Sequence, residues 1–302
     1  MKDWRRHLSF RPSTRAVALA IILAAIPAQG ADNGAWALTR LHSIPGFQVP
    51  ESVLPLPGTD IVFVSNIEAA EEQYWSDDKE GYISAISPAG VVKNRRALDS
   101  SADAVLHAPK GMALLKDGRE WLYFTDNTAL KRWPVAGGAV ETVPLPGGKR
   151  LNDAATDGEA VYVSDTEAGV VHRVAPGGEH REIQAPPGVN GLAFHNGRMF
   201  CVSWSEHEVY ELDASGKAPP RPFGLAAHFT ALDGIVALDG GSLVVSDFPG
   251  NKVALVAPDG KTVTTLVALE TPADIGLDPE RMLLYVPQFM KDTVVIFKLE
   301  KK

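Results

Sequence analysis

A short apolar strand that ends in a small or polar residue recurs six times along the chain, and this repeat constrains the fold more than any other feature. The copies end at Ser65, Thr125, Ser164, Ser203, Ser246 and Pro287. Successive ends lie about 40 residues apart, except for a longer first interval, and such a period with several strands per unit is typical of a β-propeller. The sequence therefore predicts an all-β fold, a six-bladed β-propeller of four-stranded antiparallel blades.

The expected blades are residues 49–98, 106–145, 148–185, 186–223, 228–269 and 271–302. Glycine-containing turns such as 88–90 and 258–260 fall late in the repeats, where they would join the third and fourth strands. The last unit is too short for four strands, whereas residues 36–44 have strand character and precede the first unit. Pairing of 36–44 with the last blade would close the ring and cover two sheet edges.

The N-terminal 30 residues have the pattern of a secretory signal peptide. A basic start is followed by an apolar run over 16–27 and small residues at 28–30. The apolar run is too short to span a bilayer, although an uncleaved anchor is the alternative. We expect a signal peptide at 1–30, a propeller domain at 31–302, a periplasmic or secreted protein, and no membrane association after cleavage.

The charge balance argues against two classes of partner. The first 30 residues carry five cations and one anion, so their removal changes the formal net charge from −8 to −12. An acidic protein of this kind is poorly suited to nucleic acid or anionic lipid and better suited to cations or neutral ligands. Cys201 is the only cysteine, lies in an apolar strand, and is interpreted as a buried small hydrophobe. No motif indicates a protein partner.

A polar or charged residue lies at nearly the same distance before each repeated strand end. These residues are Glu51, Lys110, Asn152, Asn190, Asp233 and Asp274. Residues at one phase of a circular repeat converge on the central axis, so a polar pocket is expected there. Glu51, Asn190 and Asp233 offer hard oxygen donors, which suit Ca²⁺ or Mg²⁺. The alternative is that Asn190-Gly191 and Asp233-Gly234 are ordinary turn dipeptides.

The first repeat contains an acidic and aromatic insertion at residues 66–81, which includes Glu68, Tyr74 and Trp75. Such a loop on one blade could be a lid over the axis, a second cation site or a solvated surface loop.

Four short motifs occur in the order and spacing of a known family. They are Pro50-Glu51-Ser-Val, Arg150-Leu-Asn152-Asp153, Val189-Asn190-Gly191-Leu and Leu232-Asp233-Gly234. With these motifs the chain resembles the gluconolactonase/regucalcin (senescence marker protein) family of six-bladed propellers, in an exported bacterial branch. The resemblance covers residues 36–302.

The resemblance implies roles for several residues. Glu51, Asn190 and Asp233 would hold a divalent cation, Ca²⁺ in the first place, with Mg²⁺, Mn²⁺ or Zn²⁺ as alternatives. Arg150 and Asn152 would contact a small-molecule substrate such as a sugar lactone, and Asp233 would also be the catalytic base. A surface charge beside Lys149 is the other interpretation of Arg150, and Asp153 and Asp157 could be turn caps.

Two residues of the axial set depart from the family pattern. Lys110 and Asp274 are assigned here to substrate binding, and Lys110 could instead form a salt bridge with Asp274 or Glu51 or act as an acid. The histidines are scattered without metal-binding spacing, and no nucleophile elbow or phosphate-binding loop is found.

These observations support two hypotheses. The first is a divalent-cation-dependent hydrolase of a lactone or related ester. The alternative is a non-catalytic propeller that binds a small ligand or a protein at the same pocket, because the fold alone does not decide function.

Overall fold

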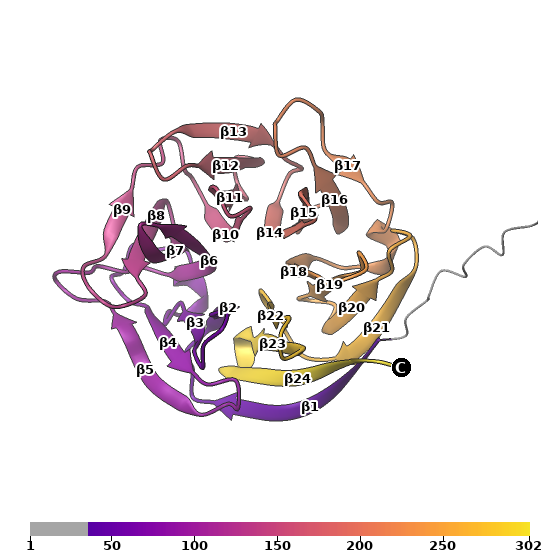
Figure 1. Cartoon of the computed structure of the whole chain (residues 1–302), viewed down its shortest axis with the longest axis horizontal. Coiled ribbons are helices and arrows are strands. Elements are labelled where there is room, and N and C mark those ends of the chain that lie inside the picture. The colour runs from indigo at the N-terminus through magenta and orange to yellow at the C-terminus, as the bar shows by residue number, and fades with distance from the viewer. Residues whose placement is uncertain (1–35) are drawn as a thin grey trace, which may run out of the picture. The chain divides into compact units, whose positions relative to one another are not determined.

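The computed structural model describes residues 36–302, which contain 24 β-strands and three short 3₁₀ helices. The predicted signal peptide at 1–30 lies outside the described residues. Strands form six four-stranded antiparallel sheets around a common centre (Figure 1). The predicted six-bladed propeller is therefore confirmed. No helix within 36–302 is long and apolar enough to cross a bilayer.

The first three blades follow one another along the chain, each running from its innermost to its outermost strand. Blade 1 is β2 (Pro50–Pro55), β3 (Val62–Asn66), β4 (Tyr82–Ile86) and β5 (Val92–Asp99), with the 3₁₀ helix η1 (Glu71–Gln73) after β3. Blade 2 is β6 (Pro109–Asp117), β7 (Arg119–Asp126), β8 (Ala129–Pro134) and β9 (Glu141–Val143). Blade 3 is β10 (Leu151–Thr156), β11 (Val161–Asp165), β12 (Val170–Val174) and β13 (His180–Gln184).

The next two blades repeat this order, and the last is shared between the two ends of the described chain. Blade 4 is β14 (Val189–His195), β15 (Arg198–Ser203), β16 (Glu208–Leu212) and β17 (Arg221–Pro222), followed by η2 (Ala226–His228). Blade 5 is β18 (Leu232–Ala237), β19 (Leu243–Asp247), β20 (Lys252–Val256) and β21 (Val263–Ala268). Blade 6 is β22 (Gly276–Asp278), β23 (Leu283–Gln288), η3 (Phe289–Lys291), β24 (Thr293–Lys301) and, outermost, β1 (Trp36–Pro45).

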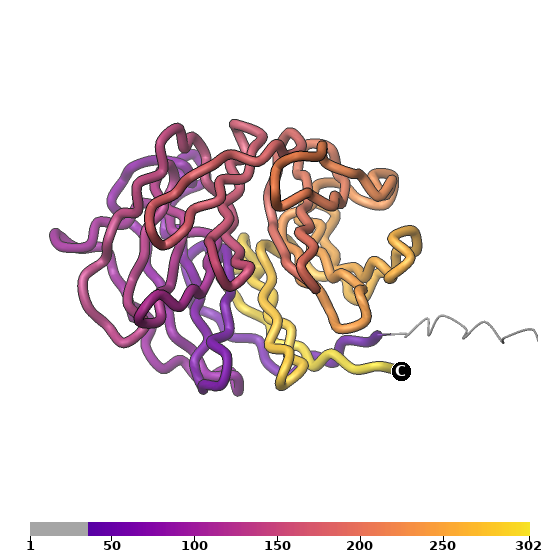
Figure 2. The backbone as a smooth tube through the Cα atoms, turned by 45° about the horizontal axis from the view of Figure 1, so that its top comes forward, coloured from indigo at the N-terminus to yellow at the C-terminus, as the bar shows by residue number. Residues whose placement is uncertain are grey.

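Strand β1 closes the ring, as the sequence predicted. It pairs antiparallel with β24 from Trp36 opposite Lys301 to Pro45 opposite Thr293. Figures 1 and 2 both show the start of β1 beside the C-terminal end of β24. Because the first and last strands share one sheet, the ring cannot open without breaking this ladder.

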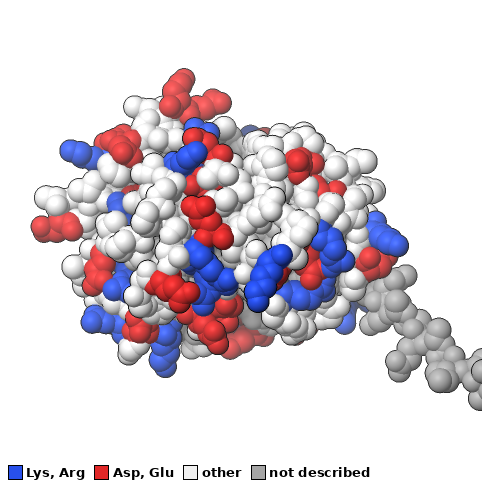
Figure 3. Space-filling view, turned by 90° about the horizontal axis from the view of Figure 1, so that it is seen from above, with Lys and Arg blue, Asp and Glu red and all other residues white. Residues whose placement is uncertain are grey.

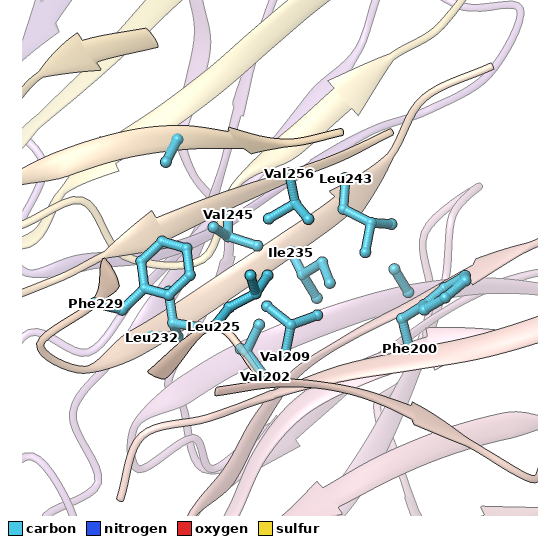
Figure 4. Close-up of a cluster of buried hydrophobic side chains, with 12 residues drawn as sticks. Phe200, Val202, Val209, Leu225, Phe229, Leu232, Ile235, Leu243, Val245 and Val256 are labelled. Carbon is cyan, nitrogen blue, oxygen red and sulfur yellow. The ribbon is translucent and has the colours of Figure 1, made fainter. Parts of the chain in front are cut away.

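The hydrophobic core is divided among the six interfaces between neighbouring blades. Figure 4 shows one of these clusters, in which Phe200 and Val202 of blade 4 pack against Ile235, Leu243 and Val245 of blade 5. Strands β3, β11 and β19 are buried along their whole length, because each blade is covered on both faces. This explains why the repeated strands are continuously apolar up to their polar ends, such as Ser65 and Ser164, rather than alternating.

Glycine allows the innermost strands to approach one another closely around the axis. A Cβ atom on Gly111 would lie 2.3 Å from the Cα atom of Asp153, and one on Gly234 would lie 2.5 Å from the nitrogen of Ile275. Both neighbours are backbone atoms of the next blade, so they cannot move aside as a flexible side chain could. Glycine at these positions therefore sets the distance between blades at the centre.

We predict that Gly111→Ala destabilises the protein by about 2–4 kcal/mol, because the added methyl group must push two blades apart in a closed ring. Gly177→Ala is the matched control, since its Cβ would meet nothing within 4 Å. Urea unfolding followed by far-UV circular dichroism measures both. Equal stabilities for the two variants would contradict this account of the ring.

Candidate functional site

A one-residue bulge near the start of each innermost strand places the six axial residues. In blade 1, Pro50 pairs with Asn66 but Val53 pairs with Val64, so β2 has one residue more than β3 over this stretch. The same shift occurs in all six blades. Bulges of this kind redirect side chains. The residues in the bulges are Glu51, Lys110, Asn152, Asn190, Asp233 and Asp274, all of them buried.

In blades 1, 3 and 5, the hydroxyl that ends the repeated strand holds the bulge in place. The amide of Ser52 donates to Ser65 Oγ at 2.9 Å, and the amide of Asp153 donates to Ser164 Oγ at 2.9 Å. In blade 5, the amide of Gly234 donates to Ser246 Oγ at 2.7 Å. Each of these amides belongs to the residue directly after an axial residue. The bulge removes this amide from the hydrogen bonds between the two strands. The serine at the end of these repeated strands is therefore explained by a buried backbone amide that needs a side-chain acceptor.

Five of the six axial residues line one cavity of about 350 Å³. This axial cavity contains Glu51, Lys110, Asn152, Asn190 and Asp233, together with Arg150. Asp274 is separated from them, because it lines a second cavity of about 520 Å³ further along the inner strands, with Asp153. The Asp274 Oδ2 atom accepts a hydrogen bond of 2.6 Å from Ser52 Oγ. The geometry therefore does not support the prediction that Asp274 contacts a substrate in the axial cavity.

Two oxygen atoms in the axial cavity are buried without a hydrogen-bond partner among residues 36–302. They are Glu51 Oε2 and Asn190 Oδ1. The amide of Asn190 is instead hydrogen-bonded to the carboxylate of Asp233. Unpartnered buried acceptors are costly, and hard oxygen donors of this kind suit a divalent cation. Within the described chain no three Asp, Glu, His or Cys side chains could hold one metal ion, so any cation here needs the Asn190 oxygen or water as a ligand.

Burial raises the pKa values of all three carboxyl groups along the axis, and neighbouring carboxylates add to this effect for Glu51 and Asp233. Burial, Asp233 and Asp274 hold the pKa of Glu51 well above its usual range, against the lowering effect of Lys110. Burial and Asp274 raise the pKa of Asp233 to about 8, while burial raises that of Asp274 to about 7. Water is excluded and like charges are close, so the ionised forms are unfavourable without a neutralising partner.

Lys110 does not form the salt bridge with Glu51 or Asp274 that was the alternative to substrate binding. Its ammonium donates to the carbonyl of Ala108 at 3.0 Å and to Asn127 Oδ1 at 3.1 Å. Burial lowers the pKa of Lys110 to about 8, although the charge of Glu51 opposes this. The ammonium also lies 4.1 Å from the ring centre of Trp75. Lys110 is thus a buried cation in the cavity wall, close to carboxylates without direct contact.

The insertion at 66–81 contributes to the cavity wall. Tyr74 and Trp75 both line the cavity, and the side chain of Asn127 holds the loop by donating to the carbonyl of Ser76 at 2.7 Å. Glu68 pairs with Arg96, so it is not available to a second cation. Two aromatic residues of the loop therefore form part of the cavity wall, whereas most of its acidic residues, such as Glu71, Glu72 and Glu80, are exposed.

Arg150 reaches the cavity from a loop that Asp165 holds. The Asp165 carboxylate accepts the amides of Lys149 at 2.7 Å and Arg150 at 3.2 Å. The Arg150 guanidinium lies 4.9 Å from the ring centre of Trp75. Asp157 is a turn cap, since it accepts the amides of Glu159 and Ala160 and the hydroxyl of Tyr162.

A second ring of residues lines the mouth of the cavity, and the sequence analysis did not identify it. Each member directly follows the second strand of its blade: Ile67, Asn127, Thr166, Trp204, Phe248 and Phe289. All but Asn127 line the axial cavity. Because they share one phase of the repeat, the signal was present in the sequence, but their mixture of apolar and polar types concealed it.

Two histidines that are apart in the sequence meet in blade 3. His172 Nδ1 lies 3.0 Å from His180 Nε2, and His172 Nε2 lies 3.4 Å from Asp165 Oδ2. The sequence analysis did not identify this contact, because the two histidines are eight residues apart and match no metal-binding spacing. Neither histidine lines the axial cavity, and His172 contacts Asp165, which holds the loop that carries Arg150.

Neither a family model nor a curated protein matches this chain. Among solved structures, a protein named as a candidate gluconolactonase has 20% identity and a TM-score of 0.64, over 89% of this chain and 93% of its own. A streptogramin B lyase has 14% identity and a TM-score of 0.62, over 88% and 98%. A PQQ-bound aldose sugar dehydrogenase from Streptomyces coelicolor has 15% identity and a TM-score of 0.61, over 88% and 99%. These likenesses show the fold and agree with the resemblance seen in the sequence.

We predict that Ser246→Ala destabilises the protein by about 1–3 kcal/mol, because two buried backbone groups lose their partner. Ser246 Oγ accepts from Gly234 and also donates to the carbonyl of Ala273 at 2.8 Å. Thermal or urea unfolding provides the measurement. The control is Ser205→Ala in an exposed turn, where a change below about 0.5 kcal/mol is expected. A similar small change for Ser246→Ala would show that the hydroxyl does not support the bulge.

Proposed function

We propose that this protein hydrolyses a lactone or related ester with the help of a divalent cation bound at the bottom of the axial cavity. One observation carries the proposal: Glu51 Oε2 and Asn190 Oδ1 are buried acceptors without partners, next to the carboxylate of Asp233. Ca²⁺ is the cation that these hard donors favour, with Mg²⁺, Mn²⁺ or Zn²⁺ as alternatives. The likeness to lactonase and lyase propellers is consistent with this proposal.

Glu51, Asn190 and Asp233 would hold the cation. When bound, such an ion polarises an ester carbonyl and stabilises negative charge on its oxygen. Two carboxylates against one divalent ion give a neutral set, which relieves the repulsion between Glu51 and Asp233.

The remaining residues would position the substrate and transfer protons. Asp233 accepts a proton from the attacking water as general base. The side chains of Asn152, Lys110 and Arg150 donate hydrogen bonds to the substrate from the cavity wall. Trp75 covers both cations and restricts access of water to the reaction.

The proposal also covers the cellular location of the protein and the molecules that it binds. An exported, periplasmic or secreted enzyme with a small-molecule substrate agrees with the N-terminal pattern of the sequence. Nucleic acid is not an expected partner. Figure 3 supports this, because acidic and basic side chains are interspersed on the face that it shows.

A binding protein without catalysis is the alternative, and the buried Lys110 favours it. An ammonium among the axial residues reduces the attraction for a cation, and its hydrogen bonds to Ala108 and Asn127 fix it there. In that case the same cavity would hold a small ligand unchanged.

We predict that Asp233→Ala and Glu51→Gln weaken Ca²⁺ binding at least 100-fold and abolish lactone hydrolysis. Loss of a residue that hydrogen-bonds to a metal ligand typically lowers the metal affinity about 10–100-fold, so loss of a direct ligand should lower it further. Calorimetry with Ca²⁺, Mg²⁺ and Mn²⁺ measures binding, and a pH-indicator assay measures hydrolysis, with the hydroxy acid product identified by mass spectrometry.

The exposed Glu280→Gln serves as the matched control and should change neither property. Hydrolysis that persists in Asp233→Ala would contradict the assignment of the base. Cation binding by the unaltered protein without turnover of any lactone would favour the binding-protein alternative.

A further inference from the structure

The axial cavity is divided into a polar floor and a largely aromatic wall. Besides the polar residues described above, seven residues with apolar or aromatic side chains line it: Ile67, Tyr74, Trp75, Trp204, Phe248, Phe289 and Met290. They come from blades 1, 4, 5 and 6, whereas Lys110, Arg150, Asn152 and Thr166 come from blades 2 and 3. A ligand that reaches the floor must therefore lie between an apolar side and a cationic side.

The aromatic rings form a continuous surface, here called the aromatic wall (Tyr74, Trp204, Phe248 and Phe289). The ring centres of Tyr74 and Phe289 are 5.0 Å apart, those of Phe248 and Phe289 are 5.4 Å apart, and those of Trp204 and Phe248 are 5.6 Å apart. Trp204 is 37% exposed and Met290 is 47% exposed, although both are large and apolar. Such exposed apolar groups at the entrance of a cavity mark a place where an apolar ligand would bind.

The wall offers few hydrogen bonds to a polyhydroxylated ligand. The Tyr74 hydroxyl of the wall is directed to Met290 Sδ at 3.6 Å, and on the opposite side the Thr166 hydroxyl already donates to the carbonyl of Val189 at 2.8 Å. A sugar ring in this cavity would place hydroxyl groups against Phe248 and Phe289. Burial of a hydroxyl without a partner is unfavourable, so the wall selects against a sugar.

The opposite side of the cavity carries an available cation. The Arg150 guanidinium makes no hydrogen bond or ion pair with any residue in the described range 36–302, and its one recorded contact is with the Trp75 ring. A guanidinium presents a planar pair of donors that matches a carboxylate in a bidentate arrangement. Lys110 adds a second positive charge on the same side.

We propose that the ligand is a small aromatic lactone or ester that carries a carboxylate group. Its ring packs on the aromatic wall, its carboxylate pairs with Arg150, and its carbonyl is directed to the floor beside Asp233. The identity of the reacting group rests on the proposed function, whereas the aromatic ring and the carboxylate rest on the wall and on Arg150 alone.

Binding of unreactive lactam analogues tests the ligand class separately from catalysis. We would compare isoindolin-1-one, its 5-carboxylate and D-glucono-1,5-lactam by calorimetry with Ca²⁺ present, and by quenching of the tryptophan fluorescence. We expect the carboxylated aromatic lactam to bind about tenfold more tightly than the uncharged one, and the sugar lactam to bind more weakly than both.

Two variants separate the ring from the carboxylate. Arg150→Gln should remove the tenfold preference for the carboxylated lactam and leave isoindolin-1-one unaffected, while Arg40→Gln on the outer strand β1 is the matched control. Trp204→Ala should weaken both aromatic lactams about tenfold, with the exposed Leu41→Ala as its control. Since Arg150 and Trp204 are solvent-exposed, both variants are expected to fold, and thermal melting verifies this.

Several results would overturn this proposal: no binding of either aromatic lactam, tighter binding of the sugar lactam, or a carboxylate preference that survives Arg150→Gln. Assays of the hydrolysis of phthalide, 5-carboxyphthalide and D-glucono-1,5-lactone then separate the proposed ligand class from the proposed hydrolase activity. Faster hydrolysis of the sugar lactone overturns the ligand class and leaves a hydrolase. Lactam binding as expected, with no lactone hydrolysed, supports the ligand class and overturns the hydrolase.

Discussion

The hydrogen bond between a bulged backbone amide and a hydroxyl of the neighbouring strand determines how this protein builds its centre. In blades 1, 3 and 5 an extra residue leaves the ladder, and Ser65, Ser164 or Ser246 accepts the amide that would otherwise be buried without a partner. The extra residue is what places a polar side chain at the axis. Glycines at 111 and 234 then allow neighbouring bulges to lie side by side.

This arrangement concentrates charge in a place that water does not reach. Glu51, Asp233 and Asp274 come from blades 1, 5 and 6. Asp233 and Asp274 raise the pKa of Glu51, and Asp274 raises that of Asp233. A closed ring can sustain such an unfavourable centre, because six hydrophobic interfaces surround it and β1 locks the last blade. The residues that are least favourable for stability are therefore those to which we assign cation and substrate binding, as is common at functional sites.

The residues at the mouth of the cavity differ in chemical type more than those at its floor. The residues that directly follow the second strands also occupy a single phase of the repeat. Their side chains vary from apolar in Ile67, Trp204, Phe248 and Phe289 to polar in Asn127 and Thr166. Asn127 occupies the same phase in blade 2 and does not line the cavity, because it holds both Lys110 and the inserted loop. A common backbone frame thus presents a common floor and a mouth whose chemistry differs from side to side.

The sequence by itself determined the number of blades, the closing strand 36–44 and the convergence of Glu51, Lys110, Asn152, Asn190 and Asp233. A regular period in a closed ring leaves little freedom for residues at one phase. Only the tertiary structure decided that Asp274 lines a different cavity, that Lys110 bonds to Asn127 instead of a carboxylate, and that Trp75 lies over both cations. It also brought His172 and His180 together. These contacts depend on side-chain direction and on a single non-repeating loop, and periodicity contains no information on either.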